Sequence, residues 1–136
     1  MSDPVMRRRH IALTFRGIDC LPAKVAEIVG VPATSSGIVG ERVKPNVQSR
    51  LTRSYVRYVL QLEEGVALDE VFGLLMRQLG GVDNLVRARE RVKPEFFEVD
   101  IAWPIKFSQE QENGYFPESV IEDLAKLRCT LGFSFL

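Results

Sequence analysis

The sequence predicts one α+β domain, a two-layer sandwich in which helices cover one face of a largely antiparallel sheet. Three observations predict this class. The strand segments alternate apolar with polar residues, amphipathic helix segments lie between them, and the elements run β-α-β-β-α-β followed by α-β. That order is typical of the ferredoxin-like split βαβ arrangement, here extended by a C-terminal helix and strand. A parallel sheet buried on both sides would instead need strands that are apolar on both faces.

Length and composition agree with a single domain. The chain has 136 residues, of which 46% are hydrophobic and 26% charged, as in an average globular domain. We expect residues 1–9, which include three consecutive arginines, to form a flexible lead-in, and residues 10–136 to form the domain. The first residues lack the apolar run of a signal peptide, and no stretch approaches the roughly 20 apolar residues of a membrane span. The expected location is the cytoplasm, with no membrane partner.

The first third of the chain predicts a strand and a helix. Residues 10–16 are predicted to form the strand because every second side chain is large and apolar. Pro22 suits the first turn of a helix, and Gly30 is placed to end that helix. Residues 31–52 are punctuated by glycine and proline and give no clear pattern, apart from a weak strand signal at 38–43.

The middle of the chain predicts a strand, two helical pieces and another strand. Residues 54–62 alternate between two faces, and a helix that begins near residue 68 ends at Gly80-Gly81. Asp83 is placed to cap a second helical piece. Residues 96–104 then form a strand, and its predicted buried face holds Phe97, Val99, Ile101 and Trp103.

The end of the chain predicts a polar loop, a helix and a last strand. Pro117 begins the helix, and residues 131–135 place a large apolar side chain at every second position. The preceding loop is too polar to serve the core, since it includes Glu110, Glu112, Asn113 and Tyr115. We expect this loop to contact a partner protein, because ordered loops often carry function. An ordinary surface connection is the alternative.

The formal net charge is zero, but the charges are divided along the chain. Residues 1–61 carry ten bases and four acids, a net charge of +6, whereas residues 62–136 carry eight bases and fourteen acids, a net charge of −6. A basic binding face is one interpretation of this division. The other is that the two halves attract each other, which fits folds whose sheets mix both halves.

Four charged residues are candidates for a site on the mixed sheet face. In the split βαβ order the first strand lies beside the third and fourth, which brings Arg16 and Arg57 close to Glu98 and Asp100. A charge-balanced sheet face is one interpretation of this grouping. The other is a pocket for a small ligand or an undetected enzyme, because paired carboxylates do acid–base chemistry when burial separates their pKa values.

Several classes of function lack the residues they need. With Cys20, Cys129 and a single histidine, His10, these residue types cannot supply a four-ligand zinc site, and we expect no metal or cofactor. Neither GxGxxG nor GxxxxGK[ST] occurs. Glu98 and Asp100 would repel phosphate on the mixed face, so we expect no nucleic-acid partner there. Cys20, near a helix N-terminus, is either a reactive thiol or a small filler, and free thiols are favoured over a disulfide.

Two segments carry a family resemblance. LTFRGIDCLPAKVAEIVGVPAT combines a strand, a turn and a proline-started helix, and ENGYFPESVIEDLAKLRCTLGFSFL combines a polar loop, an aromatic residue, a proline-started helix and a closing strand. This pattern resembles the bacterial domain-of-unknown-function family 4279, over most of residues 11–136. The chain departs from it at Leu21, where an acidic cap is usual, and in the middle strand, which lacks a tryptophan. The family has no established activity, so the resemblance implies no catalytic residues.

These observations favour a protein that acts by contact. We expect a non-catalytic protein-interaction or regulatory protein, of the immunity type in one interpretation, which rests on fold and size. The alternative is a small-ligand-binding protein or an undetected enzyme that uses the charged sheet face. A third interpretation is a homodimer that pairs through the mixed sheet face or the last strand.

Overall fold

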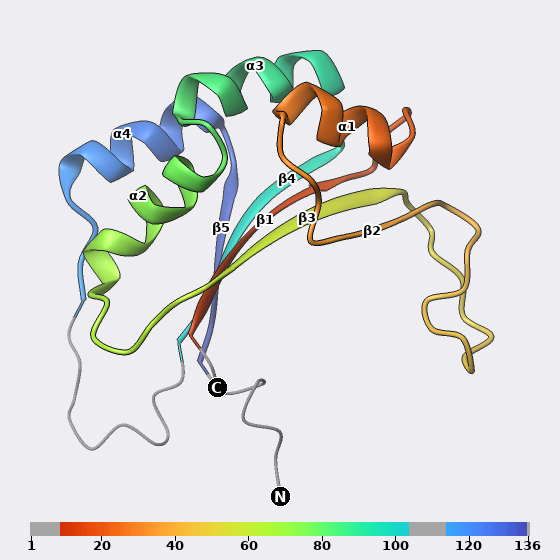
Figure 1. The fold of residues 1–136 in the computed structure, drawn as a ribbon, viewed down its shortest axis with the longest axis horizontal. Helices are drawn as coiled ribbons and strands as arrows, with labels where there is room; N and C mark the ends of the chain where they lie inside the picture. Colours follow the sequence, from red (N-terminus) through yellow and green to blue (C-terminus); the bar gives the residue numbers. More distant parts are fainter. Residues whose placement is uncertain (1–8, 104–113, 136) are drawn as a thin grey trace, which may run out of the picture.

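A computed structural model describes residues 9–103 and 114–135, which form five strands and four helices (Figure 1). In chain order these are β1 (His10–Arg16), α1 (Pro22–Val29), β2 (Ser35–Gly37), β3 (Tyr55–Gln61), α2 (Leu68–Gln78), α3 (Val82–Val92), β4 (Phe96–Ala102), α4 (Glu118–Leu127) and β5 (Thr130–Ser134). The predicted α+β class is confirmed.

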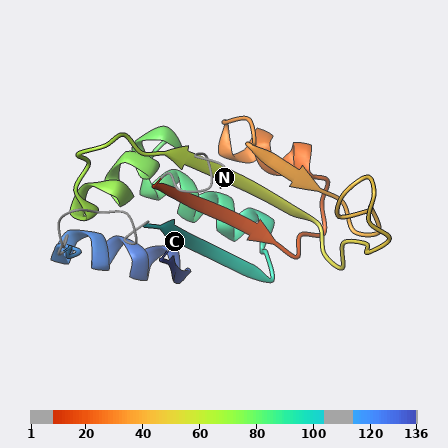
Figure 2. The same ribbon diagram turned by 90° about the horizontal axis from the view of Figure 1, so that it is seen from below.

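The strands form one sheet in the order β2-β3-β1-β4-β5. All four helices lie on the same side of this sheet (Figure 1), and the opposite side, seen from below in Figure 2, carries no helix. β1 pairs with β3 on one edge and with β4 on the other, both antiparallel, as expected from the element order. The described residues therefore form a helical layer and a sheet layer, and none of their helices covers the second face of the sheet, which we call the open face.

The sheet is mixed, which differs from the largely antiparallel ferredoxin-like sheet that the sequence predicts. β5 pairs with β4 in the parallel direction, with Glu98 opposite Thr130 and Ala102 opposite Ser134. A parallel neighbour requires a connection that crosses back to the end where the first strand begins. α4 makes this return on the helical side of the sheet (Figure 1), so β5 starts at the same end as β4 and forms an edge.

Two local predictions are wrong. The weak strand signal at 38–43 falls on a turn, because Glu41 accepts a hydrogen bond from the Ile38 amide on its carboxylate, at 2.6 Å, and donates its own amide to the Ile38 carbonyl. Asp83 is not a helix cap: Gly81 holds the N-cap position of α3 and Asp83 lies in the first turn. Its carboxylate there still suits the positive end of the helix dipole.

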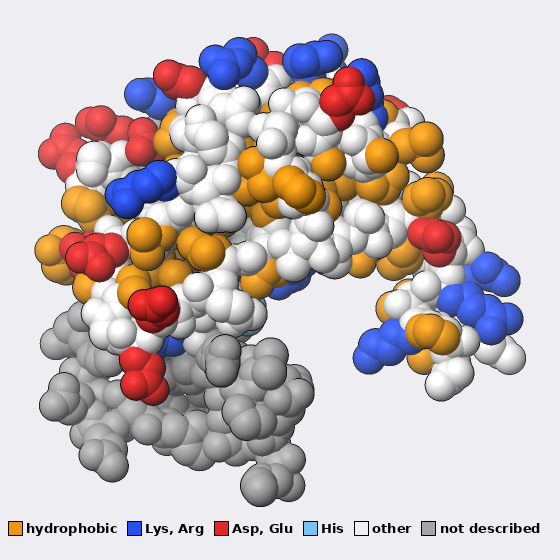
Figure 3. Space-filling model, viewed as in Figure 1, with side chains coloured by type: hydrophobic (Ala, Val, Ile, Leu, Met, Phe, Trp, Pro, Cys, Tyr) orange, Lys and Arg blue, Asp and Glu red, His pale blue; other side chains and the backbone are white. Residues whose placement is uncertain are grey.

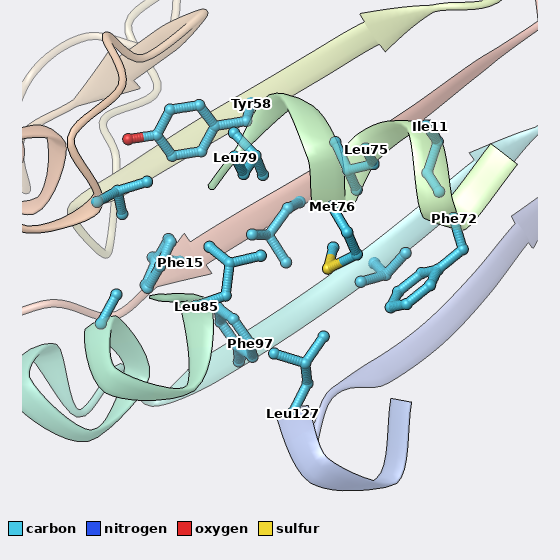
Figure 4. Packing of buried hydrophobic residues seen from close by; sticks show 14 of the residues in the cluster. Ile11, Phe15, Tyr58, Phe72, Leu75, Met76, Leu79, Leu85, Phe97 and Leu127 are labelled. Carbon is cyan, nitrogen blue, oxygen red and sulfur yellow. The ribbon is translucent and has the colours of Figure 1, made fainter. Parts of the chain in front are cut away.

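The core fills the space between the sheet and the helices (Figure 4). Ile11, Leu13 and Phe15 of β1 have no exposed surface, and Phe15 meets Phe97 of β4 edge-on with ring centroids 4.8 Å apart. The helices close this layer with large apolar side chains: Phe72, Leu75 and Met76 from α2, Leu85 from α3 and Leu127 from α4. The predicted buried face of β4 is confirmed, since its four members are all buried.

Asn84 connects three helices through hydrogen bonds. It belongs to α3, and its Nδ2 donates to the Val29 carbonyl at the end of α1 (2.9 Å) and to the Leu79 carbonyl at the end of α2 (2.8 Å). Carbonyls in the last turn of a helix lack partners within the helix, so a side-chain amide that reaches two of them holds both ends in place. The spacing of apolar residues in the sequence does not predict a polar side chain that caps two helix ends.

Tyr58 of β3 links the sheet to the segment after α1 and provides a test of the packing. Its hydroxyl donates to the Val31 carbonyl at 2.8 Å, and burial raises the pKa of Tyr58 to about 12. Because this pKa is raised above its ordinary value of about 10, the folded state favours the neutral phenol. The stability that it contributes is complete below pH 10 and is lost as the pH rises toward 12.

We predict that Tyr58→Phe lowers the free energy of unfolding by about 1–2 kcal/mol near pH 7, because the Val31 carbonyl loses its partner. The deficit relative to wild type should shrink above about pH 10, since the variant has no phenol to ionise there. Urea unfolding measured at several pH values tests this, with Tyr115→Phe as the exposed control. A deficit that stays constant up to pH 11 would contradict the role given to the buried phenol.

Candidate functional site

The open face of the sheet carries the four charged residues that the sequence singled out. Arg16 Nε donates to Glu98 Oε1 at 3.0 Å, and the Arg16 guanidinium lies 4.5 Å from the centre of the Phe96 ring. Arg16 and Glu98 lie 82 positions apart in the sequence and come from the basic and acidic parts of the chain, respectively. The predicted proximity of Arg16 to Glu98 is confirmed, and the pair neutralises itself.

A second ion pair flanks the same phenylalanine. Arg53 contacts Glu95 through two nitrogens, at 2.9 and 3.1 Å, and its guanidinium lies 5.1 Å from the Phe96 ring centre. The hydrogen bond from Arg53 lowers the pKa of Glu95 below its ordinary value, and the same bond raises the pKa of Arg53. Both groups are well exposed, so solvent screening keeps the contribution of this pair to stability small.

Arg57 and Asp100 lie on the same face of the sheet. Thr14 separates Arg57 from Glu98 in the register of the three central strands, and Asp100 lies opposite Gly132 of β5. A Cβ atom at position 132 would meet the Asp100 carboxylate, so a larger residue there would require the carboxylate to move. Within residues 9–103 and 114–135, Arg57 and Asp100 form no ion pair. The face is therefore partly charge-balanced, as one of the two interpretations expects.

A cavity of about 690 Å³ opens at the end of the sheet where β1 and β5 meet the start of α2. Its volume lies within the range of about 300–1,000 Å³ that is usual for ligand sites. The lining comes from five parts of the chain: Arg9, the segment 65–69, Trp103, the segment 114–116, and Phe133 with Phe135. None of the four charged candidates on the sheet face lines it.

Five aromatic side chains line this cavity, which we call the aromatic cavity. Phe133 lies 5.9 Å from both Phe116 and Phe135, measured between ring centroids, and the Phe133 and Phe135 rings are nearly parallel. Trp103 is buried and the Arg9 guanidinium lies 4.3 Å from its ring centre. Tyr115 and Phe135 are exposed by 66% and 62%. A ring surface that is exposed in this way gains free energy when an apolar group covers it.

Local structure explains how these rings come together. The Trp103 amide donates to the Ser134 carbonyl at 2.8 Å, which extends the β4–β5 pairing and holds Phe133 and Phe135 beside Trp103. Gly114 allows the segment after it to lie against the first residue of α2, because a Cβ at 114 would collide with Leu68. The residue that follows, Tyr115, can then line the cavity.

The rim of the aromatic cavity is acidic. The segment 63–70 carries four acids and no base, and the segment 114–118 adds Glu118. Of the described residues that line the cavity, Asp69 and Arg9 are charged, and Glu63, Glu64, Glu70 and Glu118 follow or precede the lining residues in these two segments, which carry no base. Figure 3 shows acidic side chains gathered at this end of the molecule, over the starts of α2 and α4. An apolar floor inside an acidic rim suits a group that is both apolar and positively charged.

The structure places the predicted loop residues as follows. Tyr115 lines the aromatic cavity, whereas Glu110, Glu112 and Asn113 lie outside the described residues. Phe133 and Phe135 are not predicted as site residues, because their alternation is that of the buried face of a strand. The sequence carries no signal that places them beside the segment 65–69, because only the tertiary structure brings these segments together.

Thiol and metal chemistry find little support among residues 9–103 and 114–135. No three His, Cys, Asp or Glu side chains in this part of the chain gather as a metal site would require. Cys20 and Cys129 are both free thiols. Burial raises the pKa of the Cys129 thiol, which keeps it protonated and lowers its reactivity.

No helix among the described residues has the length and apolar character needed to cross a bilayer. Comparisons with family models, with curated proteins and with solved structures give no match for this chain.

Two glycine substitutions test the cavity wall. We predict that Gly114→Ala lowers the free energy of unfolding by about 1–3 kcal/mol, because the added methyl collides with Leu68 and forces the wall to shift. It should also change the emission of Trp103, the only tryptophan. Gly73→Ala, on the exposed side of α2 with open space around it, should instead stabilise by about 0.5–1 kcal/mol and leave the emission unchanged. Thermal unfolding and fluorescence measure both, and an equal response of the two variants would contradict the close packing at Gly114.

Proposed function

We propose that this protein acts by binding a partner protein, without catalysis, and that the aromatic cavity receives a segment of the partner that is both apolar and basic. The observation that carries this proposal is the set of exposed rings inside an acidic rim. Exposed aromatic side chains beside apolar walls are typical of the centre of a protein interface, where Trp and Tyr supply most of the binding energy.

The size and charge of the cavity indicate the length and charge of the partner segment that it would bind. A space of about 690 Å³ holds a few side chains, so the cavity suits a short segment and not a large flat surface. Tyr115, Phe133 and Phe135 provide the apolar contacts, and Asp69 in the wall faces the same space. The rim acids would attract a lysine or arginine that flanks the inserted group and would repel an acidic segment.

The wider description of the protein follows from this proposal. A regulatory or immunity-type protein works by contact, so either role fits a cavity of this kind.

Membership in the domain-of-unknown-function family 4279 is supported by the proline-started helices α1 and α4 and by the closing strand β5. The position of β1 between β3 and β4 supports a ferredoxin-like description of β1–β4, with α4 and β5 as the addition. Two free thiols support a cytoplasmic location.

Titration of Trp103 fluorescence tests the function. The probe is a short blocked peptide of valine, proline and lysine, compared with the same peptide in which glutamate replaces lysine. We predict a saturable change in emission with the lysine peptide, and binding of the glutamate peptide that is weaker by roughly tenfold or more. Added salt should weaken the lysine complex, because the rim charges are exposed and therefore screened.

Two exposed apolar residues supply matched variants for this titration. Phe135→Ser removes a ring from the cavity and should abolish the response, whereas Leu21→Ser, at the start of α1 and at the opposite end of the sheet, should leave it unchanged. Binding that is equal for the two peptides, or that survives in Phe135→Ser, would overturn the proposed function.

A further inference from the structure

The connection between β2 and β3 forms a projecting arm, which we define as residues 38–50. Every residue in this range is exposed, and Figure 1 shows the segment extending away from the sheet and the helices. Hydrogen bonds nevertheless join the two sides of the arm. Those of the backbone run from Gly40 to Leu51, from Leu51 to Glu41 and from Val43 to Ser49, at 2.7–2.9 Å. Arg50 Nη1 adds a bond to the Gly40 carbonyl at 2.8 Å.

The surface of the arm is apolar and basic. Val39 and Val43 are exposed by 56% and 50%, and Ile38 and Val47 are exposed as well. Three bases, Arg42, Lys44 and Arg50, stand against one acid, Glu41, so the arm carries a net charge of +2. In Figure 3 the arm combines basic and hydrophobic side chains at the end of the molecule opposite the acidic side chains. The range 38–50 contains no aromatic residue, so it lacks the rings on which nucleic-acid bases stack.

We infer that the segment received by the aromatic cavity is the arm of a second copy of this chain. This inference rests on the proposed function and names its partner. The arm offers the two properties that the cavity selects, aliphatic side chains and positive charge. Its internal hydrogen bonds reduce the conformational freedom that it would lose on binding, which favours association.

The arm cannot enter the cavity of its own molecule. The arm precedes β3 and the acidic segment follows it, so the seven residues of Tyr55–Gln61 separate them by a strand length of about 20 Å. Figure 1 shows the arm and the start of α2 at opposite ends of the sheet. Contact between the two surfaces therefore requires two molecules.

Two copies can satisfy both contacts at once. If they lie side by side in opposite directions, related by a twofold axis, the arm of each molecule meets the cavity of the other. Such an arrangement closes on itself, so it gives a dimer and not an open filament. This orientation places the bases of each arm, net charge +2, beside the acids of the segment 63–70 in the other copy, whereas a parallel arrangement would place arm beside arm.

Sedimentation of the full chain tests the inference. We expect a concentration-dependent dimer between about 1 μM and about 1 mM, which weakens as salt is added. The arm variant Lys44→Glu with Val47→Ser and the cavity variant Glu64→Lys with Phe135→Ser should each reduce association by roughly tenfold or more. Arg87→Glu, on the exposed side of α3, makes the same charge change as Lys44→Glu and should leave association unchanged.

Mixing the two defective variants gives the decisive result. The arm variant keeps an intact cavity and the cavity variant keeps an intact arm, so a mixture should form a 1:1 heterodimer that neither forms alone. All substituted side chains are exposed, and thermal unfolding confirms that each variant folds. A mixture that stays monomeric, or a wild-type dimer that both variants leave intact, overturns the inference.

The peptide titration distinguishes failure of this inference from failure of the proposed function. The arm variant should still respond to the lysine peptide, because its cavity is unchanged. If wild type is monomeric throughout but the lysine peptide binds, the second copy is excluded and the cavity serves a different protein. If neither association nor peptide binding occurs, the function proposed for the cavity fails as well.

Discussion

β1 is hydrogen-bonded along its whole length to β3 on one side and to β4 on the other, and the rest of the structure depends on this double pairing. It joins segments from the first, middle and last thirds of the chain into one sheet. Its alternate residues Ile11, Leu13 and Phe15 then lie under the helices with no exposed surface. Because side chains alternate with a period of two, a slip of one residue would move all three to the open face, so the pattern also sets the register.

The same pairing determines where the charges of the molecule lie. β3 runs from the root of the arm to the acidic segment, and as a strand in the middle of a paired sheet it holds these two regions apart. Arg16 and Glu98 balance each other across the open face, whereas the arm and the cavity rim have no such compensation between them. Among the described residues, the arm therefore carries a net charge of +2 and the segment 63–70 a net charge of −4, at opposite ends of β3.

The aromatic cavity results from the added C-terminal helix and strand. α4 returns the chain so that β5 pairs with β4 in the parallel direction and ends beside Trp103. Phe133 and Phe135 reach the start of α2 through this arrangement, at the edge of the sheet. An antiparallel β5 would have reversed the strand and carried both rings to the opposite end. The cavity and the mixed sheet are therefore one feature of the fold.

The sequence by itself determined the local features of this protein. Alternating apolar residues located β1, β3 and β4 and their buried faces, and Pro22 and Gly30 marked the ends of α1, because periodicity and turn chemistry depend on neighbouring residues. The element order also predicted that Arg16 meets Glu98. Only the tertiary structure decided the direction of β5, the two bonds of Asn84 and the joining of five separate segments around the aromatic cavity. These features depend on which end of the sheet the chain returns to, and the periodicity of a segment is the same for either direction.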